Sequence, residues 1–252
     1  MRLTIAIAAH KAYSMPDDPC YLPVHVGAAL ASNTLGFARD DTGENISDKN
    51  RGFCELTGLY WLWKNPPDAD FLGLVHYRRH FRGRQGIARA DELADILKTT
   101  DGLLPKPRRY WIETNRSQYV HAHHAEDLDL TRAILAERHP EFLPAFDAVM
   151  AETSGHRFNM FVLRRPLFFT YCAWLFDILF ELERRLDIST YSAYDRRVFG
   201  FVGERLLDVY LRTKGIRTAE LPVLNLESQH WPRKIAAFLW RKFFRARGPS
   251  PA

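Results

Sequence analysis

Residues 70–81, DFLGLVHYRRHF, form an apolar run that ends abruptly in a cluster of basic and aromatic side chains. The cluster has no turn-forming residue before it and consists of His76, Tyr77, Arg78, Arg79 and His80. Guanidinium groups offer planar pairs of donors that match phosphate oxygens, and a tyrosine can stack or donate a hydrogen bond. The pattern favours a diphosphate clamp at the end of a strand. The alternative is a strand end whose arginines pair with surface acids.

A second segment, residues 119–129 (YVHAHHAEDLD), concentrates histidines and carboxylates, namely His121, His123, His124, Glu126, Asp127 and Asp129. Such side chains could bind a metal ion, or place a general base beside a histidine. The structural alternative is that EDLD opens a helix, since acids are favourable in a first helical turn. Zinc ligands usually come from separated elements, so a catalytic carboxylate is the more favoured of the two functions.

The third candidate is the C-terminal stretch 231–248, WPRKIAAFLWRKFFRARG, which carries six Lys/Arg residues and no acid among its aromatic residues. Tryptophan and phenylalanine beside lysine and arginine are typical of a helix that lies in an anionic bilayer surface. We therefore predict a membrane-surface tail at 230–252. The alternative is a C-terminal helix docked on the body with a solvated basic face.

These segments lie among elements that hydrophobic periodicity and turn residues predict. Strands are expected at 3–9, 71–75, 102–105, 156–165 and 218–227, helices at 22–31, 54–65, 90–99, 115–137, 168–187 and 196–215, and a polar loop at 40–52. Alternating strands and helices indicate one α/β domain, 1–229, with a mostly parallel sheet covered on both faces. Ligands bind such sheets at the carboxyl ends of the strands. We therefore expect the tip at His10 and Lys11 and the tip at 76–79 to lie on one edge, facing a phosphate ligand.

Composition sets broad limits on the function. The 252 residues are 46% hydrophobic and 26% charged, which is enough apolar matter for a substantial core. The net charge of +5 favours anionic partners without choosing among them. No P-loop, GxGxxG, GxSxG or HExxH occurs, so the common nucleotide-binding and hydrolase signatures are excluded. The three cysteines include no CxxC and are expected to be reduced thiols of a cytosolic protein. No stretch of eighteen apolar residues occurs, so no spanning helix is predicted.

Several long stretches carry a resemblance to a known family. They are AHKAY, YLPVHVGA, DDTGENISDKNRGFCELTGLYWLWKN, FLGLVHYRRHF, LLPKPRRYWIET, QYVHAHHAEDLDLTR, NMFVLRRPLFFTYCAWLFDILFELERR and RVFGFVGERLLDVYL. In these stretches, over about residues 4–227, the sequence resembles bacterial capsular and exopolysaccharide biosynthesis proteins, long filed as a domain of unknown function and later recognised as galactofuranosyltransferases. The basic tail lies outside the resemblance.

The resemblance implies a Rossmann-like domain of the glycosyltransferase A type. It also implies inverting transfer of a sugar, characteristically galactofuranose from UDP-galactofuranose, onto a growing glycan. Many such enzymes carry Asp-x-Asp at the strand end, where the aspartates hold a divalent metal against the donor diphosphate. Here that place reads His76-Tyr77-Arg78, which makes a metal doubtful, because a hard cation prefers carboxylates. We expect arginines to supply the positive charge that the leaving UDP requires; no other cofactor is expected.

The remaining roles follow from this hypothesis. A carboxylate must take the proton of the acceptor hydroxyl. Asp127 is the first candidate for this base and Glu126 the second, with His124 as an orienting partner. Glu55, on the helix before the basic strand, is a further candidate. The expected donor-binding residues are His10, Lys11, Asp41, Asn45, His76, Tyr77, Arg78 and Arg79. The expected partners are a UDP-sugar, a lipid-linked glycan acceptor and the anionic inner face of the cell membrane, with no nucleic acid.

Two hypotheses from other classes stay open at this point. One is a metal-dependent hydrolase built on the cluster from His121 to Asp127. The other is a non-catalytic partner that binds a lipid-linked glycan through the basic tail.

Overall fold

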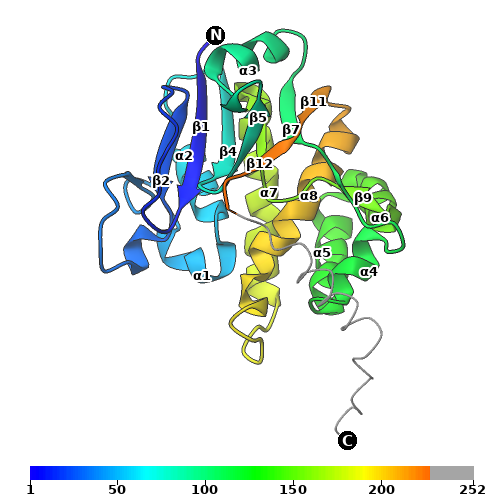
Figure 1. Cartoon of the computed structure of the whole chain (residues 1–252). Coiled ribbons are helices and arrows are strands. Elements are labelled where there is room, and N and C mark those ends of the chain that lie inside the picture. Colours follow the sequence, from blue (N-terminus) through cyan, green and yellow to red (C-terminus); the bar gives the residue numbers. More distant parts are fainter. Residues whose placement is uncertain (228–252) are drawn as a thin grey trace, which may run out of the picture.

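The computed structural model describes residues 1–227. In this part of the chain, one ten-stranded sheet has the core order β11-β7-β10-β4-β1-β2-β3 and is extended by β5, β6 and β12 (Figure 1). The strands are β1 (Leu3–Ala9), β2 (Tyr21–His25), β3 (Ala38–Arg39), β4 (Phe71–His76), β5 (Arg79–Gly83), β6 (Gly86–Ile87), β7 (Gly102–Pro105), β10 (Phe161–Arg164), β11 (Thr218–Leu221) and β12 (Val223–Asn225). A separate pair joins β8 (Arg108–Arg109) to β9 (Ser154–Gly155).

The core strands are parallel except β10, which runs antiparallel to both β4 and β7. The carboxyl ends of β1, β2, β4, β7 and β11 therefore share one edge. In the register of the central pair, Ala8 lies opposite His76, so the tip after β1 and the tip after β4 are neighbours. The predicted mostly parallel sheet and the shared edge of these two tips are confirmed.

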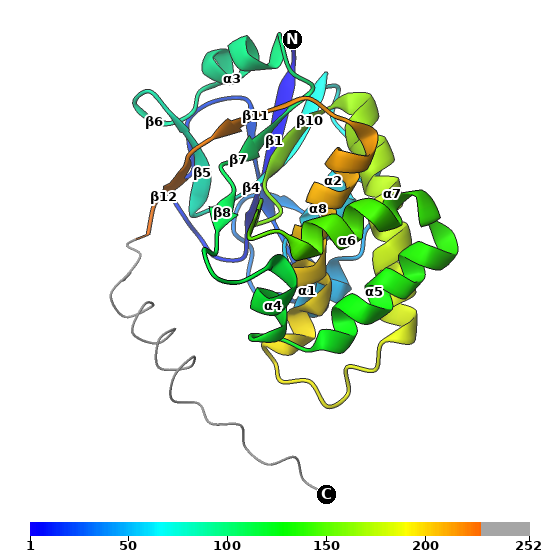
Figure 2. The same ribbon diagram turned by 90° about the vertical axis from the view of Figure 1, so that its right-hand side faces the viewer.

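Eight helices belong to the described chain: α1 (Asn50–Phe53), α2 (Leu56–Lys64), α3 (Ala90–Leu97), α4 (Asn115–Val120), α5 (Ala125–Arg138), α6 (Leu143–Ala151), α7 (Arg165–Arg185) and α8 (Val198–Lys214). Figure 2 shows α4 to α8 on one side of the sheet and α3 with β5 and β6 on the other. Short 3₁₀ turns lie at Ala28–Leu30, Ser47–Lys49, Pro140–Phe142 and Asp195–Arg197.

Two hydrophobic cores form because successive residues of a strand point to opposite faces. Alternate residues of β1 divide between them: Ala6 and Ala8 pack in the larger core with α2, α7 and α8, while Ile5 and Ile7 pack in the smaller core with α3. Because both faces are covered, β1 and β4 read as nearly continuous apolar runs. Gly73 in β4 leaves no room for a side chain, since a Cβ there would lie 2.4 Å from the Phe161 carbonyl oxygen of β10.

The structure corrects four predicted elements. Residues 22–31 are strand β2 followed by a 3₁₀ turn, not a helix. The predicted loop 40–52 contains a 3₁₀ turn and most of α1, and the predicted helix 115–137 is two helices separated at residues 121–124. The predicted strand 156–165 is shorter, as β10. In the last two cases the type of element was correct, but the helix is divided and the strand is shorter.

Residues 1–227 include no helix that is both long and apolar enough to cross a bilayer. The predicted tail 230–252, with its basic helix, lies outside the described residues.

Candidate functional site

The basic tip of β4 is a tight hairpin turn. His76 pairs with Arg79 across the turn, and the backbone N–H of Tyr77 donates to the carbonyl of Ala8, 3.1 Å away. The Tyr77 ring is buried, with 4% exposed, in edge contact with the rings of His10 (5.2 Å) and Tyr13 (5.1 Å). The buried Tyr77 ring therefore packs the tip of β4 against the tip of β1.

Two cations of neighbouring strand tips hold one carboxylate. Lys11 Nζ lies 3.1 Å from Oε1 of Glu227, and Arg78 Nη1 lies 3.3 Å from Oε2. Strand β12 delivers this carboxylate, because it pairs with β5 and the N–H of Leu226 donates to the Arg78 carbonyl at 3.0 Å. The hydrogen bond from Lys11 is the main cause of the lowered pKa of Glu227. The two oxygens of the Glu227 carboxylate thus bridge the cations of two strand tips.

Arg79 points to the inner side of the same tip. Its guanidinium lies 4.4 Å from the centre of the Phe158 ring, and its buried Nε has no hydrogen-bond partner among the described residues. Burial and then the charge of Arg78 lower the pKa of Arg79, while the carboxylates of Glu204 and Glu55 oppose that shift. Arg79 is a cation at the tip that the protein has only partly paired.

His76 and Glu55 meet behind this arginine. His76 Nε2 donates to the Phe158 carbonyl, and Glu55 Oε1 lies 3.9 Å from the same nitrogen. Burial lowers the pKa of His76 to about 4, so this histidine is neutral at pH 7. The positive charge of the tip therefore comes from Lys11, Arg78 and Arg79, whereas the sequence had suggested that His76 contributes to it.

Glu55 is a buried carboxylate with one fixed oxygen. The side-chain amide of Asn159 donates to Glu55 Oε1 at 2.7 Å, and the side chain of Glu55 is 12% exposed. Burial raises the pKa of Glu55, with the hydrogen bond from Asn159 opposing the shift. Phe158 and Asn159 both have positive φ angles, 78° and 50°, which side chains rarely adopt. The loop before β10 with these two φ angles brings the Asn159 amide to Glu55 and the Phe158 carbonyl to His76.

Arg197 of the Asp195–Arg197 turn closes the other side of this site. Its Nε donates to Cys54 Sγ at 3.1 Å, directly before Glu55 in the chain. Cys54 joins α1 to α2 with a φ of 52°, and burial raises the pKa of its thiol to about 11. The thiol is thus protonated at pH 7. Burial and the charges of Arg78, Lys11 and Arg197 lower the pKa of His10, which faces the same space.

The side chains of the predicted cluster from His121 to Asp127 contact partners elsewhere in the fold, and His123 and His124 share one of them, Asp195. His121 Nδ1 lies 2.6 Å from Glu113, and His123 Nδ1 lies 3.2 Å from Asp195. His124 stacks on the Tyr191 ring with centres 4.0 Å apart, and Glu126 is exposed. Among residues 1–227, no three His, Cys, Asp or Glu side chains are grouped so as to hold a metal ion. The geometry therefore does not support the hydrolase hypothesis.

Asp127, the first predicted base, is buried with 1% exposed. Each of its oxygens accepts a tyrosine hydroxyl at 2.7 Å, one from Tyr119 and one from Tyr191. These bonds tie α5 to α4 and to the loop before α8. Asp127 as the base stays a prediction, and its present partners give it a structural role.

Asp41 and Asn45 lie in the loop after β3 and have local partners. Asp41 pairs with Arg39 at 2.5 Å, and the side chain of Asn45 bonds to Gly43 and Ser47. Asp40, which the sequence did not single out, fixes this loop through four bonds, from the backbones of Gly27 and Ala28 and the hydroxyls of Ser47 and Thr57. Asp41 and Asn45 stay predicted nucleotide contacts.

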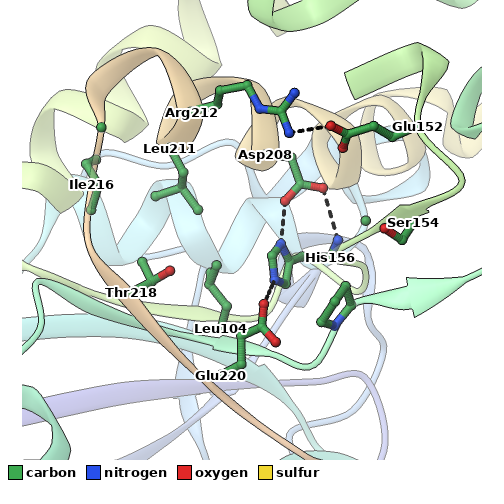
Figure 3. A pocket seen from close by; sticks show the side chains of 13 residues that line it. Leu104, Glu152, Ser154, His156, Asp208, Leu211, Arg212, Ile216, Thr218 and Glu220 are labelled. Atoms are coloured by element: carbon green, nitrogen blue, oxygen red, sulfur yellow. Dashed lines mark hydrogen bonds and ion pairs between the residues drawn. The ribbon is translucent and has the colours of Figure 1, made fainter. Parts of the chain in front are cut away.

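A pocket of about 420 Å³ opens beside β11 and α8 (Figure 3). Its residues include none of those at the strand tips. His156 lies in it between two carboxylates, with Nδ1 on Asp208 and Nε2 3.2 Å from Glu220. Burial opposes protonation of His156, but these two carboxylates together raise its pKa. The pairs connect the loop before β10 to α8 and β11, which is a structural role.

Comparison with known proteins identifies the family and the fold of the chain. Residues 4–215 match the family model described as a domain of unknown function, DUF4422, and the chain belongs to that family. No curated protein matches the chain. The apo structure of the bifunctional glycosyltransferase WbbM is similar, with a TM-score of 0.85 and 30% sequence identity. The similarity covers 90% of this chain and 46% of the WbbM chain, so the chain spans about half the length of that enzyme. The predicted fold of the glycosyltransferase A type is confirmed.

Three features of the site were missed from the sequence. Asn159, Arg197 and Glu227 reach Glu55, Cys54 and the basic tip from more than a hundred residues away. The only local signal was a pair of arginines at 196–197, and paired arginines are frequent in this chain.

Proposed function

We propose that the chain is an inverting glycosyltransferase that moves a hexose, specifically galactofuranose from UDP-galactofuranose, onto a growing lipid-linked cell-surface polysaccharide. The observation that carries sugar transfer is the pair of cations that holds a carboxylate at the strand tips, with the buried carboxylate of Glu55 next to it. The similarity to the bifunctional glycosyltransferase WbbM supports the same class of reaction. The galactofuranose donor and the polysaccharide acceptor rest on the resemblance of the sequence stretches given above.

The Glu227 carboxylate stands where we place the donor diphosphate. Lys11 and Arg78 each bind one of its oxygens, and a diphosphate offers more oxygens and more charge to the same two donors. The bound donor would displace Glu227, and the partly paired guanidinium of Arg79 would contact the same diphosphate or the sugar. His10 would line the nucleotide side of this place.

In the reaction, the acceptor oxygen forms a bond to the anomeric carbon as the bond from that carbon to the diphosphate oxygen breaks. The electron pair of the broken bond leaves with UDP, and the acceptor hydroxyl loses its proton to a base. Attack opposite the leaving group inverts the anomeric carbon. Lys11, Arg78 and Arg79 would stabilise the charge that develops on UDP, because they are fixed before the reaction.

Glu55 is the base that the geometry favours. Its pKa is raised by burial, which brings its proton affinity closer to that required of a base near neutral pH. It lies beside Arg79 and His76 and not among tyrosine hydroxyls, as Asp127 does. Glu204 on α8 is the second acid whose charge acts on Arg79. We propose Glu55 before Asp127 as the general base, and substitution of each residue distinguishes the two hypotheses.

The tip does not fit a divalent cation in the way that Asp-x-Asp does. A hard cation prefers several carboxylate or carbonyl oxygens. The equivalent place presents neutral His76, buried Tyr77 and the cation Arg78. We infer that guanidinium and ammonium groups take over the neutralisation of the diphosphate.

The basic tail would confine the enzyme to the membrane surface where a lipid-linked acceptor lies. Each of its six Lys/Arg residues contributes about 1 kcal/mol near an anionic surface. Full-length protein should therefore pellet with anionic liposomes at low salt and partly detach at high salt, whereas protein truncated after Gln229 should stay in the supernatant. Equal binding by both forms would refute the anchor. A truncated form that unfolds would mean that the tail packs on the body.

The proposed function is tested by thermal melting and calorimetry of the purified chain against UDP, UDP-galactofuranose, UDP-glucose, ADP and GDP. UDP and its sugars should raise the melting temperature, and incubation with UDP-galactofuranose should release UDP. Failure to bind any nucleotide would overturn the proposal. Binding without release or transfer, together with wild-type function of carboxylate variants in cells, would favour a non-catalytic glycan-binding protein.

A further inference from the structure

Tyr194 is an exposed aromatic ring that is nevertheless held in place. Its side chain is 56% exposed, and three groups contact it from behind. The ring centre lies 5.2 Å from that of Phe201 and 5.5 Å from that of His123, which is nearly parallel to it, and 5.8 Å from the Arg197 guanidinium. An exposed aromatic ring that is fixed in this way can offer a flat face to a ligand at little entropic cost.

The loop that carries Tyr194 is itself tied down. Asp195 accepts a hydrogen bond from Ser192 Oγ at 2.6 Å and lies 3.2 Å from His123 Nδ1. Arg196 donates to the carbonyls of Tyr191 (3.0 Å) and Ser189 (2.9 Å). The hydroxyl of Tyr191 donates a hydrogen bond to Asp127. The histidine-rich and acidic segment that the sequence singled out thus builds the support for this loop.

Arg197 connects this ring to the proposed base, because its charge acts on Glu55. Arg197 contacts Tyr194 and, through Nε, the sulfur of Cys54, the residue before Glu55. Lys11 and Arg78, the proposed diphosphate contacts, lie instead over the ring of Tyr77. A base must face the hydroxyl that it deprotonates, so the acceptor sugar belongs on the side of Glu55.

We propose that the exposed ring of Tyr194, together with the Arg197 guanidinium beside it, binds the acceptor sugar of the proposed transfer reaction. A sugar ring presents C–H groups on one face and hydroxyls around its rim. The negative face of an aromatic ring attracts the polarised C–H groups, and a guanidinium donates to hydroxyl oxygens. The stack would direct an acceptor hydroxyl toward Glu55. This inference rests on the proposed function and adds an acceptor subsite to it.

The test compares the full-length wild type with Tyr194→Ala, Tyr194→Phe and Trp111→Ala. Trp111 is a matched control, an aromatic side chain that is 82% exposed and lies in the loop before α4. Octyl galactoside is the acceptor probe, followed by saturation-transfer NMR in the presence of UDP and by transfer from UDP-galactofuranose. UDP affinity by calorimetry and hydrolysis of the donor without acceptor are measured on the same samples.

Tyr194→Ala should weaken binding of octyl galactoside, or raise its KM, by about three- to tenfold. UDP affinity and donor hydrolysis should stay within about twofold of the wild type, and Tyr194→Phe should behave like the wild type because it keeps the ring. The proposal is overturned if octyl galactoside does not bind the wild type, or if Trp111→Ala weakens its binding as much as Tyr194→Ala does. It is also overturned if Tyr194→Ala weakens UDP binding and not binding of octyl galactoside. Failure of the proposed function is distinguishable from failure of this subsite, since in that case the wild type would bind no UDP.

Discussion

The strand tips and the segment from His121 to Asp127 are both rich in titratable side chains, but the protein uses them in different ways. At the tips, Lys11 and Arg78 share one carboxylate, and Arg79 leaves a buried Nε without a hydrogen-bond partner among residues 1–227. In the second segment, His121 and Asp127 each have fixed partners on other elements.

The difference separates residues that hold a ligand from residues that hold the backbone. A buried polar group that is fully hydrogen-bonded stabilises the arrangement around it and has little left to offer a ligand. Cations gathered with few acids are unfavourable unless an anion joins them. We therefore expect substitutions at the tips to change binding and turnover, and substitutions at Asp127 to change stability.

The largest effect is expected from Glu55→Gln. Loss of a general base reduces the rate by about a hundred- to ten-thousandfold. UDP affinity should be retained, because the base acts on the acceptor. In the wild type, turnover should fall as the pH drops through the raised pKa of Glu55, above its usual 4.5. The measurements are kcat as a function of pH and calorimetry with UDP. Normal turnover in Glu55→Gln together with collapsed turnover in a folded Asp127→Asn variant would restore Asp127 as the base.

Arg78→Ala should weaken UDP binding by about ten- to a hundredfold, because it removes one charge-assisted contact to a phosphate. Arg212→Ala is a suitable control, since Arg212 pairs with Glu152 beside the pocket of Figure 3 and not at the tips. Isothermal titration of both variants with UDP gives the comparison. UDP affinity that is unchanged in Arg78→Ala, or equally reduced in both variants, would remove the diphosphate from this tip.

Asp127→Asn should lower the free energy of unfolding by about 1 to 2 kcal/mol, because the amide has one oxygen and cannot accept hydrogen bonds from both buried tyrosine hydroxyls in the same way. UDP affinity should not change. Urea denaturation monitored by tryptophan fluorescence measures the loss, with Asp129→Asn as the control, since Asp129 is an exposed acid of the same helix. A loss as small as that of the control would show that the two tyrosine bonds do not stabilise the fold.

Glu227→Gln should bind UDP about two- to fivefold more tightly than the wild type, the range expected from one exposed ion pair. The wild-type carboxylate competes with the donor for Lys11 and Arg78, and the amide does not carry its charge. The gain should shrink at high salt, which screens exposed charges. Weaker UDP binding in Glu227→Gln would mean that this carboxylate supports the site and does not compete for it.

The amino-acid sequence by itself determined the elements with strong local patterns. Apolar runs of strand length predicted β1, β4 and β7, and helical spacing predicted α2, α3, α7 and α8. The carboxyl-edge rule then brought His10 and Lys11 beside the tip at 76–79, because parallel neighbours end at the same edge. The first step depends only on the chain near each residue, and the second adds the general rule for parallel sheets.

Tertiary structure decided which carboxylate accompanies the cations. Asp127 and Glu55 are both acids near aromatic residues in the sequence, and nothing local tells them apart. The difference lies in distant partners: Tyr191 reaches Asp127 from 64 positions along the chain, and Asn159 reaches Glu55 from 104. The path of β12 to Arg78 also depends on a distant partner, through the backbone hydrogen bond from Leu226 to the Arg78 carbonyl. Burial and hydrogen bonds set the charge and role of an ionisable group, and both are properties of the folded chain.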